Sequence, residues 1–341
     1  MREINKIFLI LILVFLCGEN FGQSFHLVHK GKNRQASLYD IARTGDNEFW
    51  IGGKNATLLI MDDEGDLQNI DLTKEIGHIL RIVPDENYIW FSTTHGFLFR
   101  FDKKTGIYSK FEIFPNKPIC IYDILLSSDG KLVVAGGARK ITAGRLDYPR
   151  GFIALIDKNN PSQIQIKWNR PNAFVFALTR HKGEIVASAF AFPSMNSSIL
   201  YSADEGQSWK KKAKVKGIVH ALASVNDELF YSGSPDIFYY KNGMFGSVSK
   251  PDFRVEREGS GCFHGILGSG NQLYLSSYRG WMESVSLPHK QVERLNISNT
   301  IPLYRMMEIN DNRICAIGHA CTIYFLNKEE QPLPKMSDSD K

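Results

Sequence analysis

The sequence predicts an all-β protein, a seven-bladed β-propeller closed by an N-terminal strand. Three observations predict it: a short strand motif recurs seven times, the copies are 40 to 52 residues apart, and helical periodicity is nearly absent. A repeat of this length is typical of propeller blades with four strands each. At 341 residues and 43% hydrophobic composition, the chain is long enough to bury the core that such a ring requires.

The first 22 residues predict a cleaved secretory signal peptide. Arg2 and Lys6 precede an apolar run over residues 7–16, and small and polar residues follow up to Gly22. This run is too short for a membrane-spanning helix, and no later segment is long and apolar enough to span a bilayer. We therefore expect an exported protein, periplasmic or extracellular. A lipoprotein acylated at Cys17 is disfavoured, because Leu16 stands where a small residue is expected.

The blades are predicted within residues 23–327. In each copy an aromatic or β-branched position is followed by small residues, and the copies begin at Trp50, Trp90, Val134, Val186, Phe230, Tyr274 and Cys315. An apolar strand precedes each copy and an alternating strand follows it. One four-stranded sheet cannot cover its own two faces, so such units pack face to face around an axis. The last copy has no outer strand of its own, so we expect residues 24–31 to complete it and residues 328–341 to form a flexible tail.

Residues 88–111 resemble the two-component regulator propeller repeat. They contain, in its order, Ile89-Trp90-Phe91-Ser92-Thr93, Gly96-Phe97-Leu98, Arg100-Phe101-Asp102 and Thr105-Gly106. Residues 38–72 match less clearly, and the other five copies match only in pattern. The resemblance implies a propeller of an extracytoplasmic sensor. Members of that family join the propeller to a membrane helix and a kinase, and this sequence contains neither.

A second motif lies between two predicted strands of the fourth blade. Ser202, Asp204, Gly206 and Trp209 fit the pattern Ser-x-Asp-x-Gly-x-x-Trp, which resembles the Asp-box of BNR-like repeats. The carboxylate and the glycine shape a tight turn and the tryptophan packs on the sheet, so we assign the motif a structural role. Sialidases carry several such boxes, but their early Arg-Ile-Pro element is not found here. No catalytic residue is therefore assigned.

Two enlarged connections, in the third and fourth blades, are expected to be neighbours on one face. The first, residues 138–150, is cationic, and the second, residues 190–198, is apolar. The candidate ligand-binding residues are Arg139, Lys140, Arg145, Tyr148, Arg150, Phe190 and Phe192. A cationic loop beside an apolar one suits an acidic partner or a glycan. The alternative is a pair of tolerated insertions in which Phe190 or Phe192 covers the blade edge.

The mouth of the central channel is the second candidate site. Aligning the innermost strands brings Tyr39, Leu80, Tyr122, Phe176, His220, His264 and Tyr304 into one column. The next column contains Asp40, Arg81, Asp123 and Arg305, which are expected to face one another as a charged ring. The ordinary role of such residues is to hydrogen-bond neighbouring blades and trapped water. His220 and His264 have the chemistry of metal ligands or general bases, but no third ligand accompanies them.

Charge and cysteine content exclude several classes of protein. A net charge of +5 without a basic stripe argues against nucleic-acid binding, and no Cys/His spacing predicts a metal site or a cofactor. Cys315 and Cys321 are expected on two strands of one hairpin. They either form a disulfide or remain as two buried thiols.

The sequence thus favours an exported, non-enzymatic propeller that binds a protein or an envelope glycan through its enlarged loop face. One alternative is a hydrolase or lyase acting at the channel mouth. Another is a sensor propeller that lacks its own kinase.

Overall fold

The computed structural model describes residues 25–30, 36–72, 76–138, 141–142, 145–146, 150–235, 242–259, 261–295 and 301–328. The side chains of Phe25 and of residues 139–149 are not among those described. The predicted signal peptide with Cys17, and the predicted tail beyond residue 328, lie outside the described residues.

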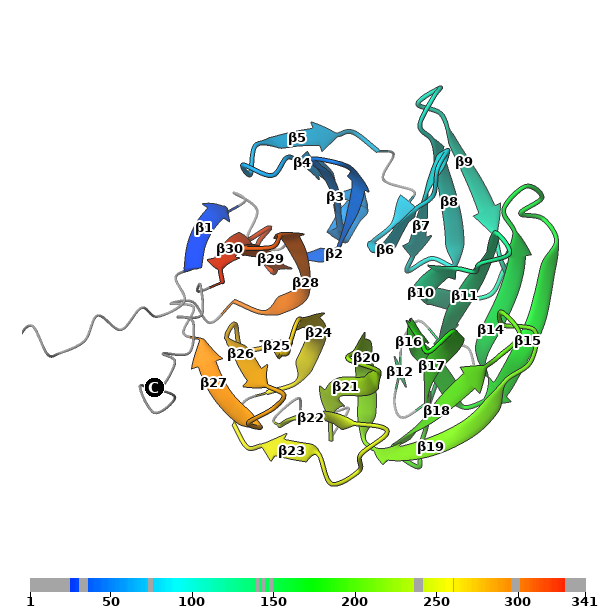
Figure 1. The fold of residues 1–341 in the computed structure, drawn as a ribbon. Coiled ribbons are helices and arrows are strands. Elements are labelled where there is room, and N and C mark those ends of the chain that lie inside the picture. Colours follow the sequence, from blue (N-terminus) through cyan, green and yellow to red (C-terminus); the bar gives the residue numbers. More distant parts are fainter. Residues whose placement is uncertain are drawn as a thin grey trace, which may run out of the picture.

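The described strands form five four-stranded antiparallel sheets and one eight-stranded sheet, arranged in a ring (Figure 1). The eight-stranded sheet consists of two four-stranded blades joined by one pairing between β11 and β16, Gly137 opposite Phe174. The all-β prediction is therefore confirmed. Blade 1 contains β2 (Leu38–Gly45), β3 (Glu48–Gly53), β4 (Leu58–Met61) and β5 (Leu67–Ile70). Blade 2 contains β6 (Ile79–Pro84), β7 (Tyr88–Thr93), β8 (Phe97–Asp102) and β9 (Tyr108–Glu112). Blade 3 contains β10 (Ile119–Leu126), β11 (Lys131–Ala138), β14 (Arg150–Asp157) and β15 (Ile164–Pro171).

The remaining blades continue the same order around the ring. Blade 4 contains β16 (Ala173–His181), β17 (Glu184–Ala191), β18 (Asn196–Ser202) and β19 (Lys210–Lys216). Blade 5 contains β20 (Ile218–Val225), β21 (Glu228–Ser234), β22 (Gly243–Ser247) and β23 (Arg254–Arg257). Blade 6 contains β24 (Phe263–Ser269), β25 (Gln272–Ser277), β26 (Met282–Ser286) and β27 (Gln291–Leu295). Blade 7 contains β28 (Leu303–Asn310), β29 (Arg313–Gly318), β30 (Ile323–Asn327) and the N-terminal β1 (Phe25–His29). Outside the blades lie the short pair β12 (Ile141–Thr142) and β13 (Arg145–Leu146), and one 3₁₀ turn, η1 (Lys54–Ala56).

The ends of the chain meet in blade 7. Strand β1 pairs antiparallel with β30, with Leu27 opposite Tyr324. Val28 packs on the apolar cluster that blades 1 and 7 share. The first strand therefore occupies the outer position that the last copy of the motif leaves open.

The hydrophobic core lies between neighbouring blades. In one cluster, Trp90 and Leu98 of blade 2 pack with Ile121, Val134 and Phe152 of blade 3, and all five are fully buried. Each such side chain contributes roughly 1.5–3 kcal/mol through burial. Contacts of this kind recur around the ring and hold the blades together.

Every innermost strand carries an irregularity at the same repeat position. In β2 the pairing with β3 skips one residue between Leu38 and Asp40, and a skip occurs at the matching position of the other six inner strands. The skipped residues are Tyr39, Leu80, Tyr122, Phe176, His220, His264 and Tyr304. A β-bulge bends the strand and re-aims a side chain, so this repeated bulge sets the lining of the channel.

The residues that resemble an Asp-box form a tight turn between β18 and β19. Asp204 accepts hydrogen bonds from the Ser202 hydroxyl (2.7 Å) and the Ser208 amide (2.8 Å), and Trp209 Nε1 donates to the Gly206 carbonyl (3.0 Å). Gly206 adopts a φ of 89°, which L-residues rarely tolerate. These contacts agree with the structural role assigned to the motif.

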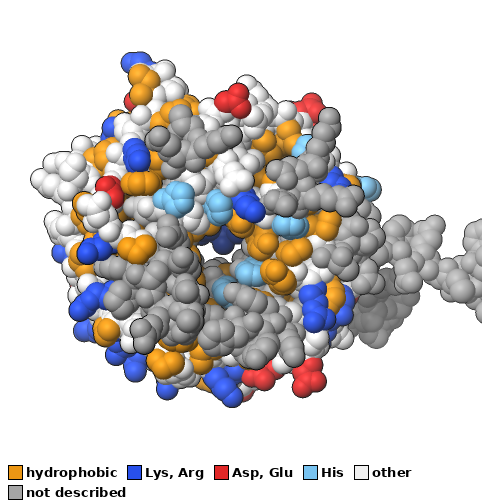
Figure 2. Space-filling view, turned by 180° about the vertical axis from the view of Figure 1, so that it is seen from behind, with side chains coloured by type: hydrophobic (Ala, Val, Ile, Leu, Met, Phe, Trp, Pro, Cys, Tyr) orange, Lys and Arg blue, Asp and Glu red, His pale blue; other side chains and the backbone are white. Residues whose placement is uncertain are grey.

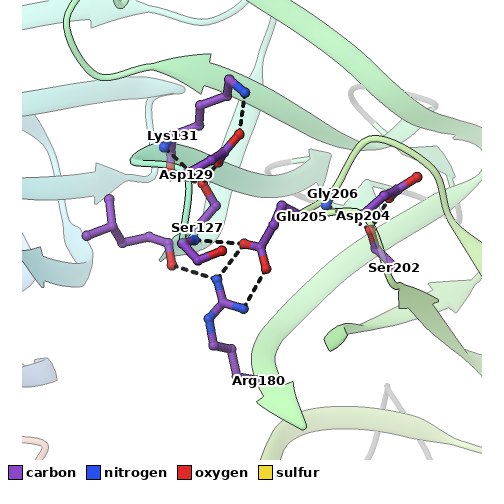
Figure 3. A network of polar contacts seen from close by, with 10 residues as sticks. Ser127, Asp129, Lys131, Arg180, Ser202, Asp204, Glu205 and Gly206 are labelled. Carbon is purple, nitrogen blue, oxygen red and sulfur yellow. Dashed lines mark hydrogen bonds and ion pairs between the residues drawn. The ribbon is translucent and has the colours of Figure 1, made fainter. Parts of the chain in front are cut away.

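The same turn connects blade 4 to blade 3 (Figure 3). Glu205 accepts hydrogen bonds from the Arg180 guanidinium (2.6 and 2.9 Å) and from the Ser128 amide (2.7 Å). Hydrogen bonds from Arg180 hold the pKa of Glu205 down at about 2, below its ordinary value of 4.5. The ion pair lies within blade 4, and the hydrogen bond from the Ser128 amide connects it to blade 3.

All four cysteines of the described chain are buried and none of them forms a disulfide, including Cys315 and Cys321. Burial raises the pKa of the Cys262 thiol to about 12 and that of Cys315 still further. Of the two alternatives for Cys315 and Cys321, the structure has the buried thiols.

Candidate functional site at the channel mouth

Strand direction gives the ring two distinct faces. The connections between the second and third strands of each blade, and those between blades, open on one face, which we call the upper face. Contacts among these connections support the assignment: the Gly217 amide donates to the Met195 carbonyl (2.9 Å), and the Ala56 amide donates to the Gly77 carbonyl. Figure 2 shows one side of the ring, where histidine and hydrophobic side chains surround a central opening.

Six bulge residues form an almost continuous ring of aromatic side chains, which we call the aromatic collar. Its members, in order around the channel, are Tyr122, Phe176, His220, His264, Tyr304 and Tyr39. Successive ring centroids are 4.9, 5.6, 5.1, 5.4 and 5.4 Å apart, which is the range of favourable aromatic pairs. Leu80 occupies the seventh position. The collar lies near the starts of the inner strands and so close to the upper face.

Below the collar, four charged residues form a chain across blades 3, 2, 1 and 7. Arg81 Nε lies 2.6 Å from Asp123 and its Nη1 lies 3.1 Å from Asp40, while Arg305 Nε lies 3.2 Å from Asp40. The structure thus brings together the four charged residues that the sequence placed in one column. They pair between blades, as such residues ordinarily do.

The two carboxylates also bind backbone amides of neighbouring blades. Asp40 accepts from the Ile82 amide (2.7 Å), and Asp123 accepts from the Leu178 amide (2.7 Å) and from Ile124 (2.9 Å). Each aspartate therefore connects its own inner strand to the next one. This arrangement gives both aspartates a structural role.

Burial controls the electrostatics of this chain. It raises the pKa of Asp123 even though Arg81 and Arg305 oppose the change. Burial also lowers the pKa of Arg305, and the nearby Arg81 adds to the decrease. For Arg81, burial acts to lower the pKa, but the two carboxylates outweigh it and the pKa is raised. Arg81 is thus the central cation of the chain.

A cavity of about 110 Å³ lies in the channel between the collar and the charged chain. Its lining includes members of both sets together with small and aliphatic residues: Tyr39, Leu80, Arg81, Tyr122, Asp123, Phe176, Ala177, Leu178, His220, Ala221, Leu222, Tyr304 and Arg305. The cavity is the concave feature that the sequence-predicted channel residues share.

The two collar histidines are neutral at physiological pH. Burial lowers the pKa of His264 to about 4, and burial together with the neighbouring His264 lowers the pKa of His220 well below its ordinary value. Their rings are tilted by 40° at a centroid distance of 5.1 Å. Among the described residues, no group of three His, Cys, Asp or Glu side chains could hold a metal ion. A base with a pKa near 4 is poorly matched to proton abstraction at neutral pH.

The connection between β17 and β18 lies on the upper face, next to the collar. Strand β17 extends to Ala191 and β18 begins at Asn196, so only residues 192–195 form the turn. Phe190 is fully buried and pairs with Phe174 in the sheet, so it supports the face from below instead of contacting a ligand. Phe192 and Met195 are partly buried and pack against the apolar cluster that contains Phe190 and Phe174.

Of the cationic side chains of the connection over residues 138–150, only that of Arg150 is described. It is exposed, and its Nη1 donates to Asn169 Oδ1 (3.2 Å). Arg139, Lys140 and Tyr148, and the side chain of Arg145, lie outside the described residues.

One apolar cluster connects the turn to the collar, and sequence reasoning missed this connection. Ala138, Phe174, Phe190 and Ile218 form its buried centre, and Tyr122, Phe176, Phe192 and Met195 pack against them. The Tyr122 hydroxyl donates to the Ala138 carbonyl (2.6 Å) at the start of the cationic connection. Phe174 and Phe176, two aromatic residues on one inner strand, were the sequence signal that the turn and the collar lie next to each other.

Comparison with known proteins gives structural but not sequence relatives. No protein-family model matches the chain, and no curated protein matches it. Solved structures do match. A streptogramin B lyase has a TM-score of 0.68 and 11% identity over 89% of this chain and 97% of that chain. A catalytically inactive virginiamycin B lyase from Staphylococcus aureus, with quinupristin, has a TM-score of 0.68 and 14% identity over 90% and 99%.

YCF48 bound to D1 peptide has a TM-score of 0.64 and 13% identity over 93% of this chain and 99% of that chain. These likenesses show the fold alone. The chain is a β-propeller. Within the described part of this propeller, no helix has the length and hydrophobicity to span a bilayer.

Proposed function

We propose that this protein is an exported recognition propeller that binds a protein or an envelope glycan through its upper face, at residues 138–150 and 190–198. The observation that carries the proposal is the apolar cluster that joins the Phe192 turn to Tyr122 and Phe176 of the collar. Through this cluster the two candidate sites form one surface. Loops on a rigid scaffold commonly carry binding residues.

The surface combines features that suit recognition. Arg150 offers an exposed cation, and Phe192 and Met195 offer partly buried apolar area. Such a mixture is typical of interfaces, where aromatic residues, Met and Arg are enriched. The solved propeller YCF48 is bound to a peptide, which supports peptide binding as a use of this fold.

The alternative function, a hydrolase or lyase at the channel, is favoured by one observation: His220 and His264 adjoin a cavity. An enzyme of this kind would need Asp40 and Arg305 to reach the cavity together with these histidines. Instead, Asp40 is held by Arg81, Arg305 and the Ile82 amide. We therefore rank recognition first.

A pull-down from native envelope extract tests the proposal. The mature protein is compared with a variant in which Arg139, Arg145 and Arg150 are changed to Glu. The matched control changes Lys210, Lys211 and Lys212 to Glu; these lysines are exposed at the start of β19, the end of this outer strand that lies away from the upper face. The two variants carry the same change in charge.

We expect the wild type and the β19 variant to capture the same partner and the loop variant to lose it. Equal capture by all three proteins would contradict the proposed face. A captured membrane kinase would identify the protein as a sensor input.

A further inference from the structure

The charged chain in the channel is satisfied at one end and open at the other. Asp123, at one end, is bound by Arg81 and by two backbone amides. At the other end, Arg305 is paired only through Nε, at 3.2 Å from Asp40, and no described residue hydrogen-bonds to its two terminal nitrogens. Arg305 therefore presents unused donors, and its side chain is 29% exposed.

The cavity lies next to these donors because only four of the seven inner strands carry a large charged residue directly after the bulge. Blades 7, 1, 2 and 3 place Arg305, Asp40, Arg81 and Asp123 at equivalent positions. Blades 4, 5 and 6 place Ala177, Ala221 and Gly265 there. Ala177 and Ala221 line the cavity together with Arg305.

A second polar atom on the cavity lining lacks a partner. Nε2 of His220 is buried and makes no hydrogen bond to any described residue. His220 lines the cavity between Phe176 and His264 of the collar. A buried polar atom without a partner is costly, so a ligand that hydrogen-bonds to it gains affinity.

The size and charge of the site restrict its occupant. About 110 Å³ is well below the roughly 300–1,000 Å³ of pockets that enclose drug-sized ligands, so one small group fits. The terminal nitrogens of a guanidinium match the two oxygens of a planar carboxylate. The four channel charges sum to zero formally, which favours a monoanion over a dianion.

We infer that the cavity binds a single carboxylate group, held by the terminal nitrogens of Arg305 and covered by the aromatic collar. The carboxylate belongs either to a small free acid or to the end of a peptide chain that enters from the upper face. The site itself consists of channel residues and does not depend on the proposed function. Only a peptide as the source of the carboxylate rests on the proposed recognition function.

Titration of the purified mature protein with propionate and with its neutral isostere propionamide tests the inference. Binding is followed at pH 7.5 and low salt by the NMR signals of the His220 and His264 side chains. We expect saturable shifts with propionate and none with propionamide. Inorganic phosphate should bind more weakly than propionate.

Variants separate the channel from the loops. Arg305→Gln should weaken propionate binding by about tenfold or more, because a charge-assisted pair is lost. Asp40 keeps Arg81 and the Ile82 amide in that variant. Arg305→Lys, which retains the charge without the fork, should bind with intermediate affinity if Arg305→Gln fails to fold. Arg150→Gln, outside the channel, should bind propionate as the wild type does.

Two short peptides of one sequence, with a free or an amidated C-terminus, identify the source. Tighter binding of the free-acid peptide than of propionate indicates a chain terminus, and weaker binding indicates a small acid. The inference is overturned if propionate fails to saturate, if propionamide or phosphate binds equally well, or if Arg305→Gln and Arg305→Lys both bind as the wild type does. Loss of propionate binding in Arg305→Gln with partner capture intact would separate this site from the loop surface.

Discussion

Removing the charge of Glu205 should destabilise blade 4 at its border with blade 3. The Glu205→Gln substitution keeps the size of the side chain and an oxygen for the Ser128 amide, but it removes the ion pair with Arg180. The pKa of Glu205 falls from 4.5 to about 2 in the folded protein. At 1.36 kcal/mol per pKa unit, this difference corresponds to roughly 3 kcal/mol as an upper limit.

Solvent reduces that value. The Arg180 side chain is 36% exposed and that of Glu205 is 24% exposed, so water screens the pair. We therefore expect the free energy of unfolding to fall by about 1–2 kcal/mol at pH 7.5. Urea denaturation followed by tryptophan fluorescence measures it. The matched control is Glu184→Gln, which breaks a more exposed pair with Lys212 (49% exposed) and should cost under about 0.5 kcal/mol.

The sign of the pH dependence follows from the lowered pKa. The contribution of Glu205 is complete above pH 4.5, the ordinary value, and is lost as the pH falls toward about 2. The difference between wild type and Glu205→Gln should therefore shrink when the pH is lowered from 6 to 3. Equal stability at pH 7.5, or a difference that does not change over this range, would contradict a stabilising role for the Glu205 charge.

Three further predictions concern the channel, the thiols and the closing strand. The pKa of His264 is lowered from 6.5 to about 4 in the folded protein. Its contribution to the free energy of unfolding is therefore complete above pH 6.5 and is lost as the pH falls toward 4. When the pH is lowered from 7 to 5, the free energy of unfolding of the wild type should fall by on the order of 2 kcal/mol more than that of the His264→Phe variant. Parallel pH profiles of the two proteins in urea denaturation would contradict this. Cys262 and Cys315 should resist alkylation at pH 7.4 until urea unfolds the chain, and rapid labelling of the native protein would contradict their burial. Deleting residues 24–31 removes β1 and should lower the free energy of unfolding by about 2–4 kcal/mol, the worth of the lost ladder; unchanged urea midpoints would argue against closure by β1.

The repeat made most of the fold predictable from the sequence. Residues 88–93 were expected as an aligned strand and form β7, and residues 24–31 were expected as the outer strand of blade 7, where β1 lies. Aligned copies occupy equivalent places in a ring, so the columns of channel residues were predictable too. This is why Asp40, Arg81 and Arg305 could be grouped without coordinates.

The details of the site depend on features that local patterns do not encode. A bulge changes which side chains face the channel, and the order of residues alone does not mark where pairing skips. Phe190 was expected in the enlarged connection over residues 190–198, yet the strand extends one residue beyond it and buries it. The cavity arises from what blades 4, 5 and 6 lack, which becomes visible only when all seven inner strands are brought together.

Photo-crosslinking tests the central claim, recognition by the upper face, most directly. Benzoylphenylalanine is placed at Ser194, exposed in the turn between β17 and β18, or at Ile107, which is 64% exposed in the connection between β8 and β9 on the opposite face. After irradiation in envelope extract, we expect one crosslinked partner from position 194 and none from position 107. The same adduct from both positions, or an adduct from position 107 alone, would contradict it.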